Sequence, residues 1–182
     1  MKSRGGFTFI EMMVVLVVTV FLSILTIVYN RSGHNQILMF KDQAVVVGLL
    51  NRAKSLAIQK YQNPLIAAND YDFCAFGVHF EAPRTMILFA DLGVGTCSVD
   101  DANYRYDPAA SPPEALETQT LDIRNEFIGL PDNGLDVLFV APELTATSSV
   151  AFPVTVTISS VSGGSTSVAN TTISAAGQIV AD

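Results

Sequence analysis

One carboxylate, Glu11, lies where a charge is costly. It follows residues 7–10 (FTFI) and precedes the uncharged run 12–30, so it belongs to one long hydrophobic segment. An ionised carboxylate at membrane depth costs about 3 kcal/mol unless a cation pairs with it, which makes such a residue a candidate for function. The alternative is that Glu11 lies at headgroup level and only caps the start of a helix, where the helix dipole favours an anion.

A second group of carboxylates could bind a cation. Asp91, Asp100, Asp101 and Asp107 lie near one another in a segment rich in Asp, Gly and Pro. Carboxylate oxygens are the ligands that Ca²⁺ prefers, but the spacing differs from the D-x-[DN]-x-[DN]-G loop of EF-hands. The four residues are therefore kept as candidates for calcium beside the simpler interpretation of a solvated acidic loop. No other metal and no organic cofactor is expected.

Residues suited to catalysis are scarce. The chain has two histidines, His34 and His79, and lacks the G-x-S-x-G, Walker A, G-x-G-x-x-G and C-x-x-C motifs. Gly93-Val94-Gly95 is too short to indicate nucleotide binding. We expect His79 to be a surface or packing residue on a strand, and we predict that the protein is not an enzyme.

The uncharged run 12–30 is long enough to cross a membrane. As a helix it would be roughly 28 Å long, close to the ~30 Å hydrocarbon core of a bilayer. Thr19, Ser23 and Thr26 are tolerable there because each hydroxyl can donate to a carbonyl in the preceding turn. A buried core helix and a cleaved secretory signal are the alternatives, but no A-x-A cleavage pattern follows the run.

Charge is distributed unevenly along the chain. Residues 1–60 hold seven Lys and Arg against two acids, a net +5, and residues 61–182 hold three against fifteen, a net −12. Lys2 and Arg4 precede the apolar run and only Arg31 follows it closely, so the positive-inside rule places the N-terminus in the cytoplasm. The total of −7 speaks against nucleic acid as a general partner.

The N-terminal residues resemble a known processing signal. The string from Arg4 to Leu16, RGGFTFIEMMVVL, is similar to the class III signal of type IV pilins and type II secretion pseudopilins. The resemblance implies that prepilin peptidase cuts after Gly6 and methylates the new amine of Phe7. It also implies that Glu11 neutralises the N-terminal amine of a neighbouring subunit during assembly. Phe9 replaces the commoner Leu, and the family's frequent helix-kinking Pro is absent.

A second helical pattern follows the apolar run. Residues 36–62 predict a stem helix whose apolar stripe repeats at steps of three and four. The predicted stripe consists of Ile37, Phe40, Ala44, Val47, Leu50, Ala53, Ala57 and Tyr61. Asn63-Pro64 ends the pattern, and residues 31–35 are a point where the helix could bend. We expect a near-continuous helix from Phe7 to Gln62, with residues 51–60 similar to the stem of H-type (GspH/FimT-like) minor pseudopilins and minor pilins.

The remainder predicts β-structure. Residues 73–81 alternate, with Cys74, Phe76, Val78 and Phe80 on one face. Strands are also expected within 86–90, 121–127, 135–141, 154–159, 166–174 and 176–180, and residues 161–165 should form a turn. The segment 91–120 is predicted to be a long surface loop. The expected fold class is α+β, a long N-terminal helix packed on an antiparallel sheet.

Two cysteines, Cys74 and Cys97, are present. Because the body is predicted to lie outside the cytoplasm, where disulfides persist, we predict that they form a bridge. It would stabilise the body by roughly 3 kcal/mol through loop closure. Two buried free thiols are the alternative.

These observations combine into one domain scheme. We expect a leader at 1–6, a transmembrane and assembly helix at 7–30, a stem helix at 31–63 and an extracytoplasmic body at 64–182. The predicted function is a structural subunit of a type IV pilus-like filament, anchored in the inner membrane before assembly. Expected partners are prepilin peptidase, other pilin or pseudopilin subunits and the inner-membrane assembly platform. An H-type pseudopilin of type II secretion, a DNA-uptake pilin and a plain single-span anchored domain are the alternatives.

Overall fold

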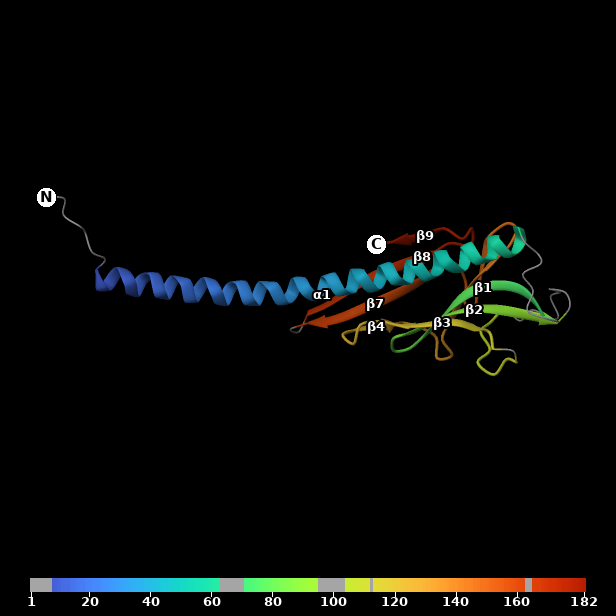
Figure 1. Ribbon diagram of the computed structural model, residues 1–182, viewed down its shortest axis with the longest axis horizontal. Coiled ribbons are helices and arrows are strands. Elements are labelled where there is room, and N and C mark those ends of the chain that lie inside the picture. Colours follow the sequence, from blue (N-terminus) through green and yellow to red (C-terminus); the bar gives the residue numbers. More distant parts are fainter. Residues whose placement is uncertain (1–7, 63–70, 95–103, 112, 163–164) are drawn as a thin grey trace.

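A single long helix begins the structure. The computed structural model describes residues 8–62, 71–94, 104–111, 113–162 and 165–182. Helix α1 (Phe9–Gln62) is continuous through residues 31–35, where the sequence indicated that the helix could bend. The body lies along its C-terminal half, and the N-terminal half projects from it (Figure 1). This confirms the expected long helix on a β-rich body.

Nine strands follow α1 among the described residues. They are β1 (Tyr71–Glu81), β2 (Thr85–Val94), β3 (Ala115–Thr120), β4 (Asn125–Ile128), β5 (Leu135–Val140), β6 (Thr145–Ser148), β7 (Val154–Ser162), β8 (Ser165–Ile173) and β9 (Ile179–Ala181). They form two antiparallel sheets, in the orders β3-β2-β1-β5-β6 and β4-β7-β8-β9. The expected α+β class is confirmed, with two sheets in place of one.

Several strand predictions need correction. The segment 91–120, predicted to be a loop, contains the end of β2 and all of β3. Of the segment 121–127, predicted to be a strand, residues 125–127 belong to β4 and residues 121–124 are not strand. Strand β3 has no buried residue, since Glu117 and Gln119 are half-buried and the other residues are exposed, and its sequence, ALETQT, carries no hydrophobic alternation. A strand at a sheet edge needs little buried surface, and periodicity therefore misses it.

A bulge in β1 changes which side chains face the core. The pairing of β1 with β2 shifts between Phe73 and Ala75, so Cys74 lies at the irregularity. Phe76, Val78 and Phe80 are buried in the main core as predicted. The bulge, however, brings Phe73 to the core side as well, where its ring lies 5.5 Å from that of Phe76. The simple alternation assigned Phe73 to the opposite face, and that assignment was wrong.

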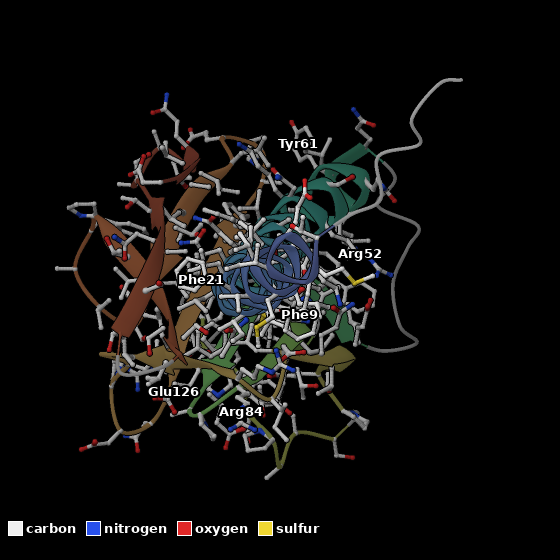
Figure 2. All side chains as sticks on the ribbon, turned by 90° about the vertical axis from the view of Figure 1, so that its left-hand side faces the viewer. Phe9, Phe21, Arg52, Tyr61, Arg84 and Glu126 are labelled. Atoms are coloured by element: carbon white, nitrogen blue, oxygen red, sulfur yellow. The ribbon has the colours of Figure 1, made fainter. Side chains whose placement is uncertain are left out.

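The main core lies between α1 and the two sheets. Viewed along the helix, α1 lies in the angle between them (Figure 2). The buried helix residues are Met39, Val46, Leu49, Leu50, Ala53 and Ala57. Of the predicted stripe, Leu50, Ala53 and Ala57 are confirmed, whereas Ile37, Phe40, Ala44 and Tyr61 are exposed. The buried face is rotated relative to the predicted one at the beginning of the stem.

Polar contacts hold the helix in this position. Asp42 Oδ2 accepts hydrogen bonds from the backbone N–H of Asp122 (2.8 Å) and from Asn125 Nδ2 (2.7 Å). Gln43 Nε2 donates to the carbonyl oxygens of Asn170 (2.8 Å) and Asp182 (3.1 Å). Asp42 and Gln43 are buried, although the helical pattern placed Asp42 on the polar side. Asp42 thus joins α1 to the turn between β3 and β4, and Gln43 joins it to the C-terminal strands.

Candidate functional site

The N-terminal part of α1 has no covering in the structure. The span Phe9–Ile27 has a mean hydropathy of 2.6, and none of it is buried. Its large apolar side chains, including Phe9 (82%) and Ile10 (72%), are mostly exposed to solvent. An apolar surface of this size on a helix has to be covered by lipid or by other protein. This apolar helix is the first candidate functional site.

Hydroxyl side chains within the span donate hydrogen bonds to backbone carbonyls of the preceding helical turn. Thr19 Oγ1 donates to the carbonyl of Val15 (2.9 Å), Ser23 Oγ to that of Thr19 (2.8 Å) and Thr26 Oγ1 to that of Leu22 (2.8 Å). This confirms the arrangement expected from the sequence and removes most of the cost of placing a hydroxyl in an apolar medium.

Glu11 takes part in the start of the helix. Thr8 N–H donates to Glu11 Oε2 (3.5 Å), and Glu11 N–H donates to Thr8 Oγ1 (3.4 Å). This reciprocal pair is a capping box, in which each side chain satisfies a backbone donor of the first turn. The capping role that the sequence left as an alternative is therefore present in the single chain. It also holds the carboxylate at the first turn of the helix. Gly6 and Phe7 lie outside the described residues.

The predicted calcium residues are only partly covered by the described chain. Asp100 and Asp101 lie outside it. Asp91 is buried and accepts a hydrogen bond from Tyr104 N–H (3.2 Å), while Asp107 Oδ1 accepts one from Ala109 N–H (2.8 Å). Among the residues that the structure describes, no group of three His, Cys, Asp or Glu side chains is arranged to hold a metal.

Asp91 instead belongs to a buried carboxylate pair with Glu114. Burial raises the pKa of Asp91, and the hydrogen bond from Tyr104 opposes this effect. Burial, with a smaller contribution from the nearby charges of Asp91 and Asp107, raises the pKa of Glu114 to about 6. Glu114 Oε2 accepts from Asp107 N–H (2.7 Å), so the two carboxylates hold residues 104–107 against the sheet. Sequence reasoning missed Glu114, because nothing in the pattern around it indicates burial.

Only one of the two cysteines can be placed. Cys74 lies in β1 at the bulge and is half-buried. Cys97 lies outside the described residues, so the Cys74–Cys97 bridge stays a prediction.

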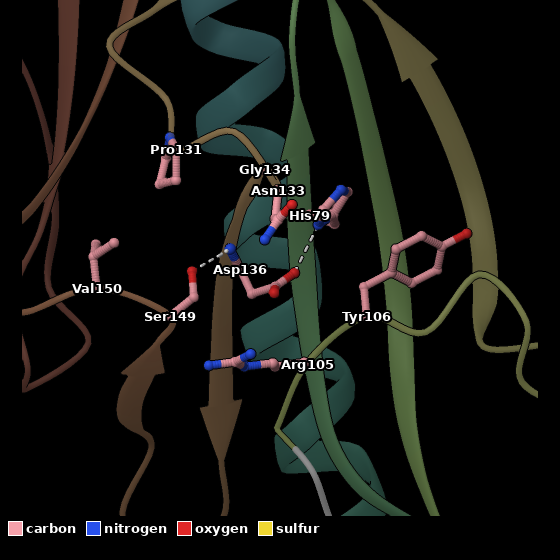
Figure 3. Close-up of a pocket in the computed structure, with 9 residues that line it drawn as sticks. All are labelled: His79, Arg105, Tyr106, Pro131, Asn133, Gly134, Asp136, Ser149 and Val150. Atoms are coloured by element: carbon pink, nitrogen blue, oxygen red, sulfur yellow. Dashed lines mark hydrogen bonds and ion pairs between the residues drawn. The ribbon is translucent and has the colours of Figure 1, made fainter.

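A second candidate site lies on the opposite face of the five-stranded sheet from α1. His79 on β1 and Asp136 on β5 are directly opposite each other, and His79 Nδ1 lies 2.7 Å from Asp136 Oδ1. They lie in a cavity of about 300 Å³ that is also lined by Arg105, Asn133 and Ser149 (Figure 3). His79 is thus a packing residue, as expected, but the sequence did not indicate its partner. The pairing depends on β5 lying beside β1, which no local pattern predicts.

Comparison with known proteins gives one match. Residues 1–27 match the family model of the prokaryotic N-terminal methylation motif. No curated protein and no solved structure matches the chain. The match covers the exposed apolar helix and the residues before it, and it leaves the body unassigned. Residues 1–27 thus carry the prokaryotic N-terminal methylation motif, which supports the resemblance of the N-terminal segment to type IV pilins and pseudopilins.

Proposed function

We propose that this chain is a minor subunit of a type IV pilus-like filament, processed by prepilin peptidase after Gly6 and methylated at Phe7. The observation that carries the proposal is the methylation motif at residues 1–27, joined to an apolar helix with no covering along Phe9–Ile27. In the membrane, lipid would cover this surface, and in a filament the helices of neighbouring subunits would do so. The body would lie on the extracytoplasmic side.

The proposed role of Glu11 follows from its surroundings. The residue is exposed, and its neighbours along the helix are apolar. Hydrogen bonding with Thr8 holds its carboxylate at the first turn of the helix. In an apolar environment an unpaired carboxylate is costly, and an amine of a neighbouring subunit would remove that cost. Glu11 would thereby favour assembly over the separate subunit.

Mass spectrometry of the N-terminus tests the processing step. The full chain is expressed with prepilin peptidase, purified from membranes and compared with the Gly6→Val variant, whose branched side chain should crowd the scissile bond. We expect N-methyl-Phe7 in the parent chain and an intact N-terminus in the variant. An unchanged N-terminal Met1 segment in the parent chain would contradict the proposal and would favour a plain single-span anchor.

Glu11→Ala tests the assembly step separately. We expect normal cleavage but at least about tenfold less incorporation into sheared filaments, because the helix still inserts while its acidic partner for the amine is gone. Glu126→Ala, which removes an exposed acid from the body, is the matched control and should assemble normally. Normal incorporation of the Glu11 variant would refute the pairing role.

A role as an H-type pseudopilin in type II secretion rests on the stem resemblance at residues 51–60. The same N-terminal chemistry serves both systems, so deletion of the gene distinguishes them. Loss of a secreted enzyme would favour type II secretion, and loss of surface filaments with normal secretion would favour the pilus.

A further inference from the structure

The cavity on the outer face of the five-stranded sheet has no part in the proposed function. Its floor lies on the side of β1 and β5 that faces away from α1, where a small second core contains Ala75, Phe89 and Leu138. Its volume of about 300 Å³ is at the lower end of the range for small-ligand sites.

The floor of the cavity is rigid. His79 and Asp136 are 11% and 8% exposed at their side chains, and their bond fixes the orientation of both. Asp136 N–H donates to Ser149 Oγ at 3.1 Å, which ties the floor to the segment after β6. Gly134 has φ +79°, and a Cβ there would clash with His79 Cε1. The turn before β5 can approach the imidazole only because residue 134 has no side chain.

Arg105 and Tyr106 form the wall of the cavity beside His79. The segment that contains them is held by the hydrogen bonds that Asp91 and Glu114 accept from it. The ring of Tyr106 lies 5.0 Å from that of His79 and 5.4 Å from that of Phe89. Arg105, the preceding residue, brings its guanidinium to the cavity, as Figure 3 shows. The polar groups therefore come from four separate segments that the fold brings together, which contain His79, Arg105, Asn133 with Asp136, and Ser149.

The chemistry of the lining is mixed. Arg105 only donates hydrogen bonds, the Asp136 carboxylate only accepts them, and the Asn133 amide does both. The formal charges of Arg105 and Asp136 are opposite, so these two side chains add no net charge to the lining. A sugar hydroxyl both donates and accepts, so it suits this set, whereas a carboxylate only accepts and could not donate to Asp136. Pro131 and Val150 add apolar surface that suits the C–H faces of a sugar ring.

We propose that this cavity binds a neutral saccharide of one or two rings, with Arg105, Asn133 and Asp136 as its hydrogen-bonding residues. The site would give the body a recognition role that is independent of the N-terminal helix. A single sugar ring has few atoms, so a dissociation constant of about 1 mM is expected.

Saturation-transfer NMR tests this binding on the full chain in a detergent without a sugar headgroup. Glucose, galactose and N-acetylglucosamine are the neutral probes, and acetate is the anionic probe. We expect transfer to at least one of the sugars and none to acetate. Transfer to acetate alone, or to no probe at concentrations of about 50 mM, well above the expected dissociation constant, would overturn the proposal.

Three variants locate the binding. At sugar concentrations well below the expected dissociation constant of about 1 mM, Arg105→Ala and Asn133→Ala should each lower the sugar signal about tenfold, because each removes a hydrogen-bonding group from the cavity. Arg124→Ala removes a guanidinium that does not line the cavity and should leave the signal unchanged. Far-UV circular dichroism checks that each variant is folded. Equal signals in all three variants would place the sugar elsewhere and refute the site. N-terminal processing is measured separately, so absence of sugar binding would leave the pilin proposal intact.

Discussion

The two halves of α1 have opposite surroundings, although one helical backbone runs through both. From Phe9 to Ile27 no residue is buried, and the exposed side chains are large and apolar. From Met39 onward one face is buried against two sheets, and polar residues such as Asp42 and Gln43 make specific bonds there. The first half is suited to any apolar surrounding, and the second half fits only this body. The difference indicates that assembly and body stability can be changed independently.

The largest effect should come from a matched pair of leucines. Leu50→Ala removes a fully buried side chain and should lower the free energy of unfolding of the body by about 3 kcal/mol. Leu22 is 54% exposed, so Leu22→Ala should change it by less than about 0.5 kcal/mol. Denaturant unfolding of the full chain in detergent, followed by far-UV circular dichroism, measures both. Equal losses would show that the two halves are not independent.

The polar attachment of the stem should contribute the next largest effect. Asp42→Ala leaves the Asn125 amide and the Asp122 N–H without their acceptor in a buried region, which should cost about 2 kcal/mol. Lys41→Ala changes the adjacent, exposed position and is the control. The same unfolding measurement applies. A loss no larger than that of the control would mean that the apolar contacts alone position the helix.

A smaller, pH-dependent effect is expected in the body and not in the apolar half. The pKa of Glu114 is raised from 4.5 to about 6, so the folded state holds a proton that the unfolded state releases between these values. The contribution of this group to the free energy of unfolding therefore falls as pH rises from 4.5 to about 6 and is constant above. This fall in the free energy of unfolding should amount to about 1 kcal/mol, after allowance for solvent screening, and Glu114→Gln should remove it.

Thermal unfolding between about pH 4 and about pH 8, a range that contains both pKa values, measures this decline. Glu143→Gln, at an exposed position, is the control and should follow the parent chain. An unchanged pH profile in the Glu114 variant would contradict the assignment.

The smallest effect should be confined to the helix start. Thr8→Ala removes one half of the capping box and should weaken only the first turn, by about 0.5 kcal/mol. Hydrogen exchange should show about twofold less protection of the Glu11 amide, in line with that free energy. Thr19→Ala, whose hydroxyl bonds within the helix, should leave this amide unchanged. Loss of protection throughout the span to Ile27 would show that the cap controls the whole apolar half.

Local patterns predicted the elements better than their surroundings. The helix and the strands at 135–141 and 154–159 were found because their hydrophobic residues are frequent and regular. The stem face was partly wrong, since Ile37 and Phe40 repeat at the same steps as the buried residues. A helical period identifies an apolar stripe but does not decide which of two overlapping stripes meets the sheet.

The candidate sites divide in the same way. Glu11 and its neighbours lie within a few positions of one another, so the sequence alone identified the methylation motif, which the family model then matched. The His79–Asp136 pair joins residues far apart in the chain, and Asp91 and Glu114 meet only because a loop folds back on β2. Asp100 and Asp101 were grouped with Asp91 by proximity in sequence, which does not establish proximity in space.

The sequence by itself determined the apolar helix, its processing signal, the acidic β-rich body and the charge asymmetry between them, because each depends on neighbouring residues. Only the tertiary structure decided that the strands form two sheets and that Asp42 and Gln43 of the helix are buried against the body. It also decided that a polar cavity forms on the face of the five-stranded sheet that points away from the helix. These features depend on which distant segments pack together. That choice is made by the summed burial and hydrogen bonding of the whole chain.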